Sequence, residues 1–438
     1  MLKKQITRGS FGVYAAVALA AGLICNNASA GSFQGGPTHE ANSEGALPDI
    51  RSPRWEYKAG GPIISSATES DGVIFFGSDD RKMRALDADS GTEKWVFATG
   101  GKIRSTPAVE QGLVVFISYD GIIYALDEKS GKERWRFQTA GERHFEAKGI
   151  HGSKPATQTV PDFWDCYQSS ASVVDGIAYI GSGDGCMYAL NLADGDLAWK
   201  FQTGDVVHTS PAVADGIVYF GSWDTYLYAL DAKSGAEIWR FKTGDDLEKH
   251  NRTGIQSSPT VCEGTVYFGC RDFNFYALDA KSGEEKWKSN LTWVNATPAI
   301  WDGKVYYGTS IPSWFIGKDG ATGEDVMKLN MPMMVFGSAN IVNGVAYFGS
   351  FQGSLFAVDL KEGKIIAEFR SPNALDNNGR LFKEDGSWNL SSIFRNDDFD
   401  EVYHSVNVLF ESGALLASPL IHNGNLYIGS ADGSLFAF

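Results

Sequence analysis

The chain repeats a pattern of short apolar segments separated by turn residues. In one copy the segments are 210–214 (SPAVA), 217–222 (IVYFGS), 227–231 (LYALD) and 237–243 (EIWRFKT). They are rich in Val, Tyr, Phe and Ala and are bounded by Gly, Asp and Ser, which is typical of short strands joined by tight turns. Each copy therefore predicts a four-stranded antiparallel meander, whose strands are named A to D in chain order.

Eight copies of this meander are present. Each carries a glycine in its first turn, and the spacing is close to 40 residues in most copies; these glycines are Gly72, Gly112, Gly176, Gly216, Gly264, Gly303, Gly344 and Gly424. A meander repeated at this period indicates a β-propeller with one blade per copy. The predicted fold is all-β, a single eight-bladed propeller.

The last copy ends after its third strand, SLFAF (434–438). The missing strand D is found at the other end of the chain, because RWEYKAG (54–60) matches KWVFATG (94–100) position by position. We expect this N-terminal strand to complete the last blade and close the ring, so that no edge stays open between the first and last repeats. The propeller then spans 54–438, preceded by a flexible leader over 31–53 that is rich in Gly, Pro, Ser and Asn.

Residues 1–30 have the pattern of a secretory signal. Basic residues precede an apolar run that ends at Ala28-Ser29-Ala30, which predicts cleavage after Ala30 and a periplasmic or secreted protein. No other apolar run approaches the length of a membrane span. The remaining chain has 35 Lys and Arg against 53 Asp and Glu, a net charge of −18, which disfavours nucleic acid as a partner. We expect a monomer.

The phrase ALD-xx-SG-xxx-W resembles the tryptophan-docking repeat of the quinoprotein-type (PQQ-like) eight-bladed propellers. The docking position is occupied by Trp55, Trp95, Trp135, Trp199, Trp239 and Trp287, and departs from the pattern at Met327 and Ala367. The family includes dehydrogenases that use pyrroloquinoline quinone (PQQ) and the non-catalytic outer-membrane assembly factor BamB. The resemblance implies the fold and leaves the function open. The adjacent Cys-Cys pair of quinoprotein alcohol dehydrogenases is absent from this sequence.

Three insertions interrupt the repeat, at 142–166, 245–254 and 371–413. All three connect strand D of one blade to strand A of the next, so all lie at the same end of the ring. Elaboration confined to one face predicts a binding site on that face. The alternative is loop growth without function.

Strand A of each blade lines the central channel. Alignment of the copies places one residue per blade at the channel mouth: Ile64, Arg104, Gln168, His208, Gln256, Asn295, Phe336 and Leu416. Blades 2 to 6 contribute polar residues and blades 7, 8 and 1 apolar ones. Such a ring suits an amphiphilic small-molecule ligand; the alternative is a water-filled channel.

The resemblance and this ring suggest roles for individual residues. His208 and His151 are the candidate catalytic bases. Arg104, Gln168, Gln256, Asn295, Trp223, Arg271 and Trp164 are candidates for binding the cofactor, through charge, amide groups or ring stacking. The candidate metal ligands are His144, His250 and His404.

Two further features bear on ions and redox chemistry. Residues 395–401 (RNDDFDE) form an acidic cluster that could hold calcium, but it lacks EF-hand spacing, which favours a solvated loop. Cys166 and Cys186 lie close enough in the predicted blade for a disulfide.

The sequence thus supports three functions. The first is a periplasmic oxidoreductase that uses PQQ, with calcium or another divalent metal, to oxidise an alcohol or a sugar. The second is a BamB-like scaffold that binds other exported proteins. The third is a metal-dependent hydrolase or lyase built on the histidines.

Overall fold

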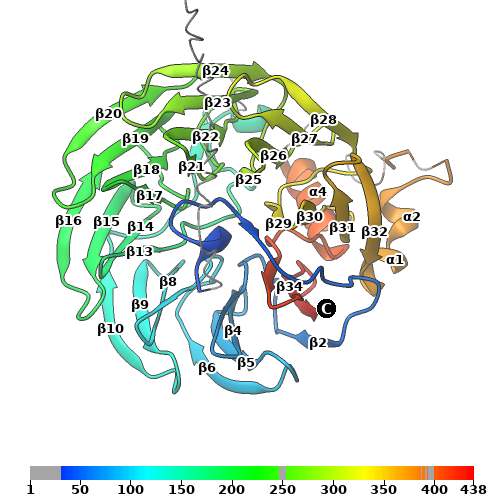
Figure 1. Cartoon of the computed structure of the whole chain (residues 1–438), viewed down its shortest axis with the longest axis horizontal. Helices are drawn as coiled ribbons and strands as arrows, with labels where there is room; N and C mark the ends of the chain where they lie inside the picture. Colours follow the sequence, from blue (N-terminus) through cyan, green and yellow to red (C-terminus); the bar gives the residue numbers. More distant parts are fainter. Residues whose placement is uncertain (1–30, 246–252, 386, 390–391, 393–398) are drawn as a thin grey trace, which may run out of the picture.

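The computed structural model describes residues 31–245, 253–385, 387–389, 392 and 399–438. Eight four-stranded antiparallel sheets surround a central channel, with the innermost strand of each sheet against the channel (Figure 1). The predicted eight-bladed propeller is confirmed. The predicted signal, 1–30, lies outside the described residues.

The blades follow one another in chain order. Blades 1 to 4 comprise β3 (Thr68–Ser70), β4 (Val73–Ser78), β5 (Lys82–Asp87) and β6 (Glu93–Ala98); β7 (Ala108–Glu110), β8 (Leu113–Ser118), β9 (Ile122–Asp127) and β10 (Glu133–Gln138); β13 (Ser172–Val174), β14 (Ile177–Gly181), β15 (Cys186–Asn191) and β16 (Leu197–Gln202); and β17 (Ala212–Ala214), β18 (Ile217–Gly221), β19 (Tyr226–Asp231) and β20 (Glu237–Lys242). Blades 5 to 8 comprise β21 (Thr260–Cys262), β22 (Thr265–Gly269), β23 (Asn274–Asp279) and β24 (Glu285–Asn290); β25 (Ala299–Trp301), β26 (Lys304–Gly308), β27 (Trp314–Asp319) and β28 (Asp325–Asn330); β29 (Asn340–Val342), β30 (Val345–Gly349), β31 (Ser354–Asp359) and β32 (Lys364–Arg370); and β33 (Leu420–His422), β34 (Asn425–Gly429), β35 (Ser434–Ala437) and β2 (Trp55–Lys58).

The N-terminal strand closes the ring, as predicted. Strand β2 pairs antiparallel with β35, with Trp55 opposite Ala437 and Lys58 opposite Ser434. The two ends of the propeller are therefore held in one sheet, and the junction leaves no unpaired strand between the first and last blades.

The repeated tryptophans hold neighbouring blades together. Trp239 donates a hydrogen bond from Nε1 to the carbonyl of Ala280 (3.0 Å) in the next blade. Its ring lies over Gly283, where a Cβ atom would come within 2.7 Å of the indole. The same pair of contacts is made by Trp55, Trp95, Trp135, Trp199 and Trp287.

The two departures from this pattern sit at the last two blade junctions. Met327 packs beside Gly363, where a Cβ atom would lie 3.5 Å from the Met327 Cγ. Ala367 packs into the apolar cluster where the ends of the propeller meet, together with Ile50 and Phe438. At the junction of Ala367 a large ring is not needed, because residues near the two chain ends fill the space.

Residues 31–53, predicted as a flexible leader, lie packed along the inner strands on one face of the ring. The segment contains η1 (Phe33–Gly35) and β1 (Asn42–Ser43), and β1 pairs parallel with β29. His39, Ala41 and Ile50 are buried. In Figure 1 the segment crosses the centre of the propeller in blue. The face that it covers is called the leader face below.

The insertions occupy the opposite face, called the elaborated face. The first contains β11 (Glu146–Lys148), η2 (Ile150–Gly152) and β12 (Thr159–Pro161), and the last contains α1 (Pro372–Asp376), α2 (Asn378–Leu381) and α4 (Phe399–Glu411). Trp164 of the first and Leu381, Val406 and Leu409 of the last share one apolar cluster, so the two meet. Among the described residues, no helix has the length and hydrophobicity to cross a membrane.

Candidate functional site: the two faces of the channel

The eight residues predicted at the channel mouth all line one cavity on the propeller axis. The predicted strand register is therefore confirmed. The cavity measures only about 40 Å³. Phe33 of the leader and Tyr167 also line it, and the Tyr167 hydroxyl donates to the carbonyl of Leu416 (3.1 Å) in blade 8. The channel is thus filled by side chains from both faces.

The first insertion carries the acidic residues that fill the elaborated side. Its strands β11 and β12 pair antiparallel, from Glu146 opposite Pro161 to Lys148 opposite Thr159. This hairpin is followed by Asp162 and Asp165, which are 0% and 1% exposed. Buried carboxylates require a cation or hydrogen-bond donors as partners. The polar residues of the ring provide these partners.

His208 lies between two of these carboxylates. Its Nδ1 donates to Oδ1 of Asp165 (2.7 Å) and its Nε2 donates to Oε1 of Glu142 (2.9 Å). Burial alone would lower the pKa of His208, but the charge of Asp165 and the hydrogen bonds to both carboxylates raise it to about 10. A base must hold a free lone pair at neutral pH. A protonated ring with both nitrogens engaged does not meet that requirement, so the predicted catalytic role does not fit this geometry.

Arg271 is buried completely and is held by Asp162. Its Nη1 donates to Oδ2 of Asp162 at 2.6 Å. Its guanidinium also lies between two indoles, 4.7 Å from the ring of Trp223 and 4.3 Å from that of Trp293, which are favourable cation–π distances. Trp223 in turn stacks on Phe145 of the insertion, with ring centres 4.5 Å apart. Trp223 and Arg271 therefore contact the protein itself, while Nε1 of Trp223 and Nε and Nη2 of Arg271 have no hydrogen-bond partner among the described residues.

His151, the second candidate base, contacts the same carboxylate. Its Nε2 lies 3.0 Å from Oδ1 of Asp162. Burial alone would raise the pKa of Asp162, but the charges of Arg271 and then His151 hold it well below its usual range. Asp162 is thus an anion that contacts both Arg271, a predicted cofactor-binding residue, and His151, a predicted catalytic base.

The remaining polar residues of the ring are also engaged. Arg104 donates to both oxygens of Asp79, at 2.8 and 2.6 Å, and to the carbonyl of Cys166 at 3.1 Å. Gln168 accepts from the backbone amide of Arg104 (2.9 Å). Gln256 donates to the carbonyl of Trp164 (2.7 Å). Asn295 differs, because neither side-chain atom has a hydrogen-bond partner among the described residues.

The apolar half of the ring is covered by the insertions as well. Trp164 packs edge-on against Phe336 (5.9 Å) and Phe351 (6.0 Å). Val406 and Leu409 of α4 belong to the same buried cluster. The first insertion therefore contacts both halves of the ring, and the last insertion adds to the cover of the apolar half.

The predicted metal ligands do not form a site in the described part of the chain. The Nδ1 of His144 lies 2.7 Å from the backbone carbonyl of Asp165, His404 is half-buried on α4, and His250 lies outside the described residues. No group of three or more His, Cys, Asp or Glu side chains with metal-binding geometry occurs among the described residues. Most of the acidic segment 395–401 also lies outside them. Cys166 and Cys186, the pair considered for a disulfide, do not form one.

PQQ does not fit the predicted site. Pockets for ligands of drug size measure about 300–1,000 Å³, whereas the cavity at the mouth measures about 40 Å³. The cations that would face the quinone and its carboxylates already face Asp79, Glu142, Asp162 and Asp165. Sequence reasoning missed these four carboxylates, although three lie in the first insertion, where an excess of acid facing a basic ring could have signalled them.

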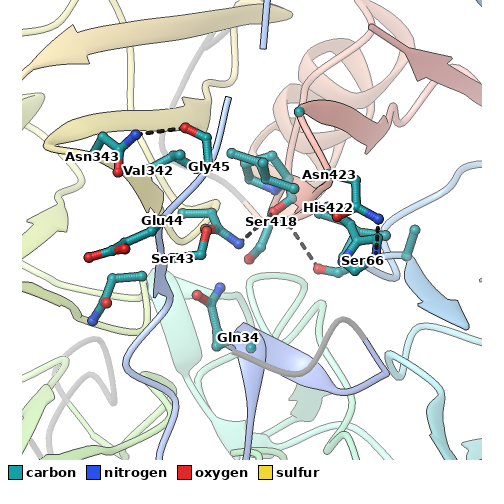
Figure 2. A pocket seen from close by; sticks show the side chains of 18 of the residues that line it. Gln34, Ser43, Glu44, Gly45, Ser66, Val342, Asn343, Ser418, His422 and Asn423 are labelled. Atoms are coloured by element: carbon teal, nitrogen blue, oxygen red, sulfur yellow. Dashed lines mark hydrogen bonds between the residues drawn. The ribbon is translucent and has the colours of Figure 1, made fainter. Parts of the chain in front are cut away.

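A separate opening lies on the leader face. A cavity of about 480 Å³ is bounded by the leader and by the inner strands of blades 7, 8 and 1 (Figure 2). Its lining includes Gln34, Asn340, Ser418 and Ile421. Sequence reasoning missed this cavity, because the repeat is regular there and the leader was expected to be flexible.

Comparison with known proteins agrees with this fold. A family model described as outer membrane protein assembly factor BamB matches residues 48–160 and 151–366. No curated protein sequence matches the chain.

Solved structures with the same fold include both classes of the family. BamB from Moraxella catarrhalis has a TM-score of 0.61 at 16% identity, covering 88% of this chain and 96% of its own. The quinohemoprotein alcohol dehydrogenase from Comamonas testosteroni has a TM-score of 0.68 at 13% identity, covering 94% and 80%. A europium-containing methanol dehydrogenase has a TM-score of 0.65 at 13% identity, covering 92% and 91%. Identities this low show a shared fold alone.

Proposed function

We propose that this chain, which belongs to the family described as outer membrane protein assembly factor BamB, is an exported, non-catalytic scaffold that binds other exported proteins. The observation that carries the proposal is the channel mouth, where buried carboxylates, most of them in the chain's own first insertion, face the cations that a cofactor or substrate would need. His208, Arg271 and Arg104 each face a buried carboxylate. A ligand that must first break such contacts would bind with little net free energy.

An oxidoreductase that uses PQQ is supported by the likeness of fold alone. The solved dehydrogenases share the propeller at 13% identity. A PQQ site here would require the first insertion to leave the mouth, which would expose Asp162 and Arg271 and break their contact. We therefore derive no reaction step through PQQ, and no observed geometry favours a hydrolase or lyase.

The outer strands offer a surface for protein partners. Ile238, Val326 and Ile366 occupy the same position on strands β20, β28 and β32, just before the docking residue, and are 45, 46 and 48% exposed. Each of these strands is the outermost in its sheet, so it presents unpaired backbone groups beside an apolar side chain. Strand edges of this kind bind extended segments of other proteins. The predicted signal ending at Ala30 supports an exported location.

A cross-linking experiment with matched variants tests the scaffold. We expect full-length protein, cross-linked in its native envelope and purified, to carry partners at stoichiometric amounts. Replacing Ile238, Val326 and Ile366 together by Lys should reduce their recovery by roughly tenfold, which corresponds to about 1.4 kcal/mol. The control replaces Val96 and Leu197, which are also exposed on outer strands at other positions.

A cofactor assay tests whether the protein is non-catalytic, as proposed. The purified protein is mixed with PQQ and calcium, and dye reduction is followed with alcohols and sugars as substrates. We expect no turnover. Steady dye reduction that depends on both PQQ and substrate would overturn the proposal, and so would equal partner recovery from the triple variant and its control.

A further inference from the structure

The cavity on the leader face has the features of a binding site for a peptide. It measures about 480 Å³ and is lined by polar side chains of the leader and of three inner strands. Its volume lies within the range of ligand pockets. It is on the other side of the ring from the insertions, and it adjoins the channel cavity described above, with which it shares Phe33, Ser66 and Ser418.

The leader shows how an extended chain binds to this face. Its carbonyls accept hydrogen bonds from the backbone amides of inner strands in five blades, at 2.6 to 3.0 Å; the donor and acceptor pairs are Val109 and Gly31, Val213 and Pro37, Val261 and Thr38, Ile300 and Glu40, and Ile341 and Ala41. These amides occupy one equivalent position in the repeat. The backbone N–H at this position points into the channel, because the backbone hydrogen-bonding groups of successive residues point to alternate sides of a strand.

In blade 8 the equivalent residue is Ile421, which lines the cavity. Its register partner Leu426 exchanges both of its hydrogen bonds with Phe438, on the far side (3.2 and 2.8 Å). The backbone of Ile421 therefore faces the cavity. Within the described residues, the leader makes no such bond to the inner strand of blade 8. Its last backbone hydrogen bond on this face is donated by the amide of Asn343 to the carbonyl of Ser43.

A buried side chain in the same cavity lacks a partner. Gln34 is 6% exposed, and its Oε1 has no hydrogen-bond partner among the described residues. Figure 2 shows its amide directed into the space in front of Ser66 and Ser418. A buried carbonyl oxygen left unpaired is destabilising, so it favours a ligand that donates to it. Gln34 also has a φ of 51°, a strained backbone conformation for a residue with a side chain.

We propose that this cavity binds a short extended segment of another protein. A carbonyl of that segment accepts from the amide of Ile421, as the leader carbonyls do in five other blades, and one of its amides donates to Oε1 of Gln34. The lining residues include Glu44 but neither Lys nor Arg, so the segment is neutral or basic. The proposal depends on the leader face alone, and it can fail while the scaffold function holds.

The test uses fluorescein-labelled hexapeptides, acetylated and amidated, in one neutral and one basic pool. We expect saturable binding to the full mature chain by fluorescence anisotropy. Ala46→Trp fills the cavity from its exposed rim and should weaken binding more than tenfold. Leu47→Trp is the matched control, because Leu47 is the next residue and does not line the cavity. Gln34→Leu should weaken binding by about fivefold, the loss of one neutral hydrogen bond.

Thermal melting of each variant separates loss of binding from loss of folding. Absence of peptide binding by the folded wild type at millimolar concentration overturns the proposal. Equal binding by the Ala46→Trp and Leu47→Trp variants also overturns it, and so does saturable binding of maltohexaose in place of either peptide pool.

Discussion

The two faces of the channel differ in what closes them. On the elaborated face, a long insertion fills the mouth, and its buried carboxylates pair with His208 of the ring and with Arg271. On the leader face, a short segment binds through its backbone and leaves a cavity of about 480 Å³ beside it. A long insertion on a propeller can therefore close the channel as readily as it forms a binding site there.

A buried histidine on each face shows the same contrast in charge. His208 faces two carboxylates, which raise its pKa to about 10. His39 of the leader faces only the carbonyl of Pro259 (2.9 Å), and burial lowers its pKa to about 4. One face therefore holds a protonated imidazole and the other a neutral one.

The largest expected effect is the pH dependence contributed by His208. Because its folded pKa lies above the unfolded value of about 6.5, its stabilisation is complete below pH 6.5 and is lost as the pH rises towards 10. The whole change is on the order of 5 kcal/mol at about 1.4 kcal/mol per pKa unit. Denaturant unfolding of the wild type and His208→Gln from pH 6 to pH 10 measures it. A stability difference that stays constant over this range would contradict the assignment.

The second effect is the loss of the Arg271 charge. Arg271→Met removes the partner of Asp162 in a fully buried pair, and we expect a loss of about 3–5 kcal/mol in the free energy of unfolding. The control is Arg51→Met, which breaks an ion pair whose side chains are 80% and 61% exposed; it should leave the denaturation midpoint unchanged. Similar midpoints for the two variants would mean that the insertion is not held by this pair.

The repeat made most of the fold predictable. A period near 40 residues set the number of blades, and the match of 54–60 to 94–100 located the closing strand, which the pairing of Trp55 with Ala437 confirms. The channel-lining residues were also predictable, since a slip of one residue would turn every strand A side chain away. In these elements each local signal is repeated eight times.

The contents of the channel were not predictable in the same way. Asp162 and Arg271 are 109 residues apart, and nothing in the spacing of a unique insertion states which ring residue it contacts. The composition of 31–53 suggested flexibility, yet its binding depends on backbone carbonyls, which composition does not reveal. His208 looked like a base because its partners, Glu142 and Asp165, lie in a segment without a repeat to align.

The third effect is the opposite pH dependence on the leader face. Because the folded pKa of His39 lies below the unfolded value, its stabilisation is present above pH 6.5 and is lost as the pH falls towards 4. The change is about 3 kcal/mol over this range. It is measured as the stability difference between the wild type and His39→Leu from pH 7 to pH 4.5, with hydrogen exchange of residues 31–45 as a local readout. Protection factors of the leader, corrected for the intrinsic exchange rate at each pH, that are lower at pH 7 than at pH 4.5 would contradict it.

The smallest effect concerns the point where the leader leaves the inner strands. Asn343 donates from Nδ2 to the carbonyl of Gly45 (2.6 Å) and has a φ of 48°. Asn343→Asp removes the donor and places an anion against the carbonyl, at a cost of about 1 kcal/mol. The backbone tolerates the change, since Asp175 and Asp215 adopt φ of 51° and 50° in equivalent turns. Asn423→Asp at φ 50° is the control. Hydrogen exchange at 42–46 should rise in the first variant alone; an equal rise in both would mean that this bond does not hold the leader at the cavity rim.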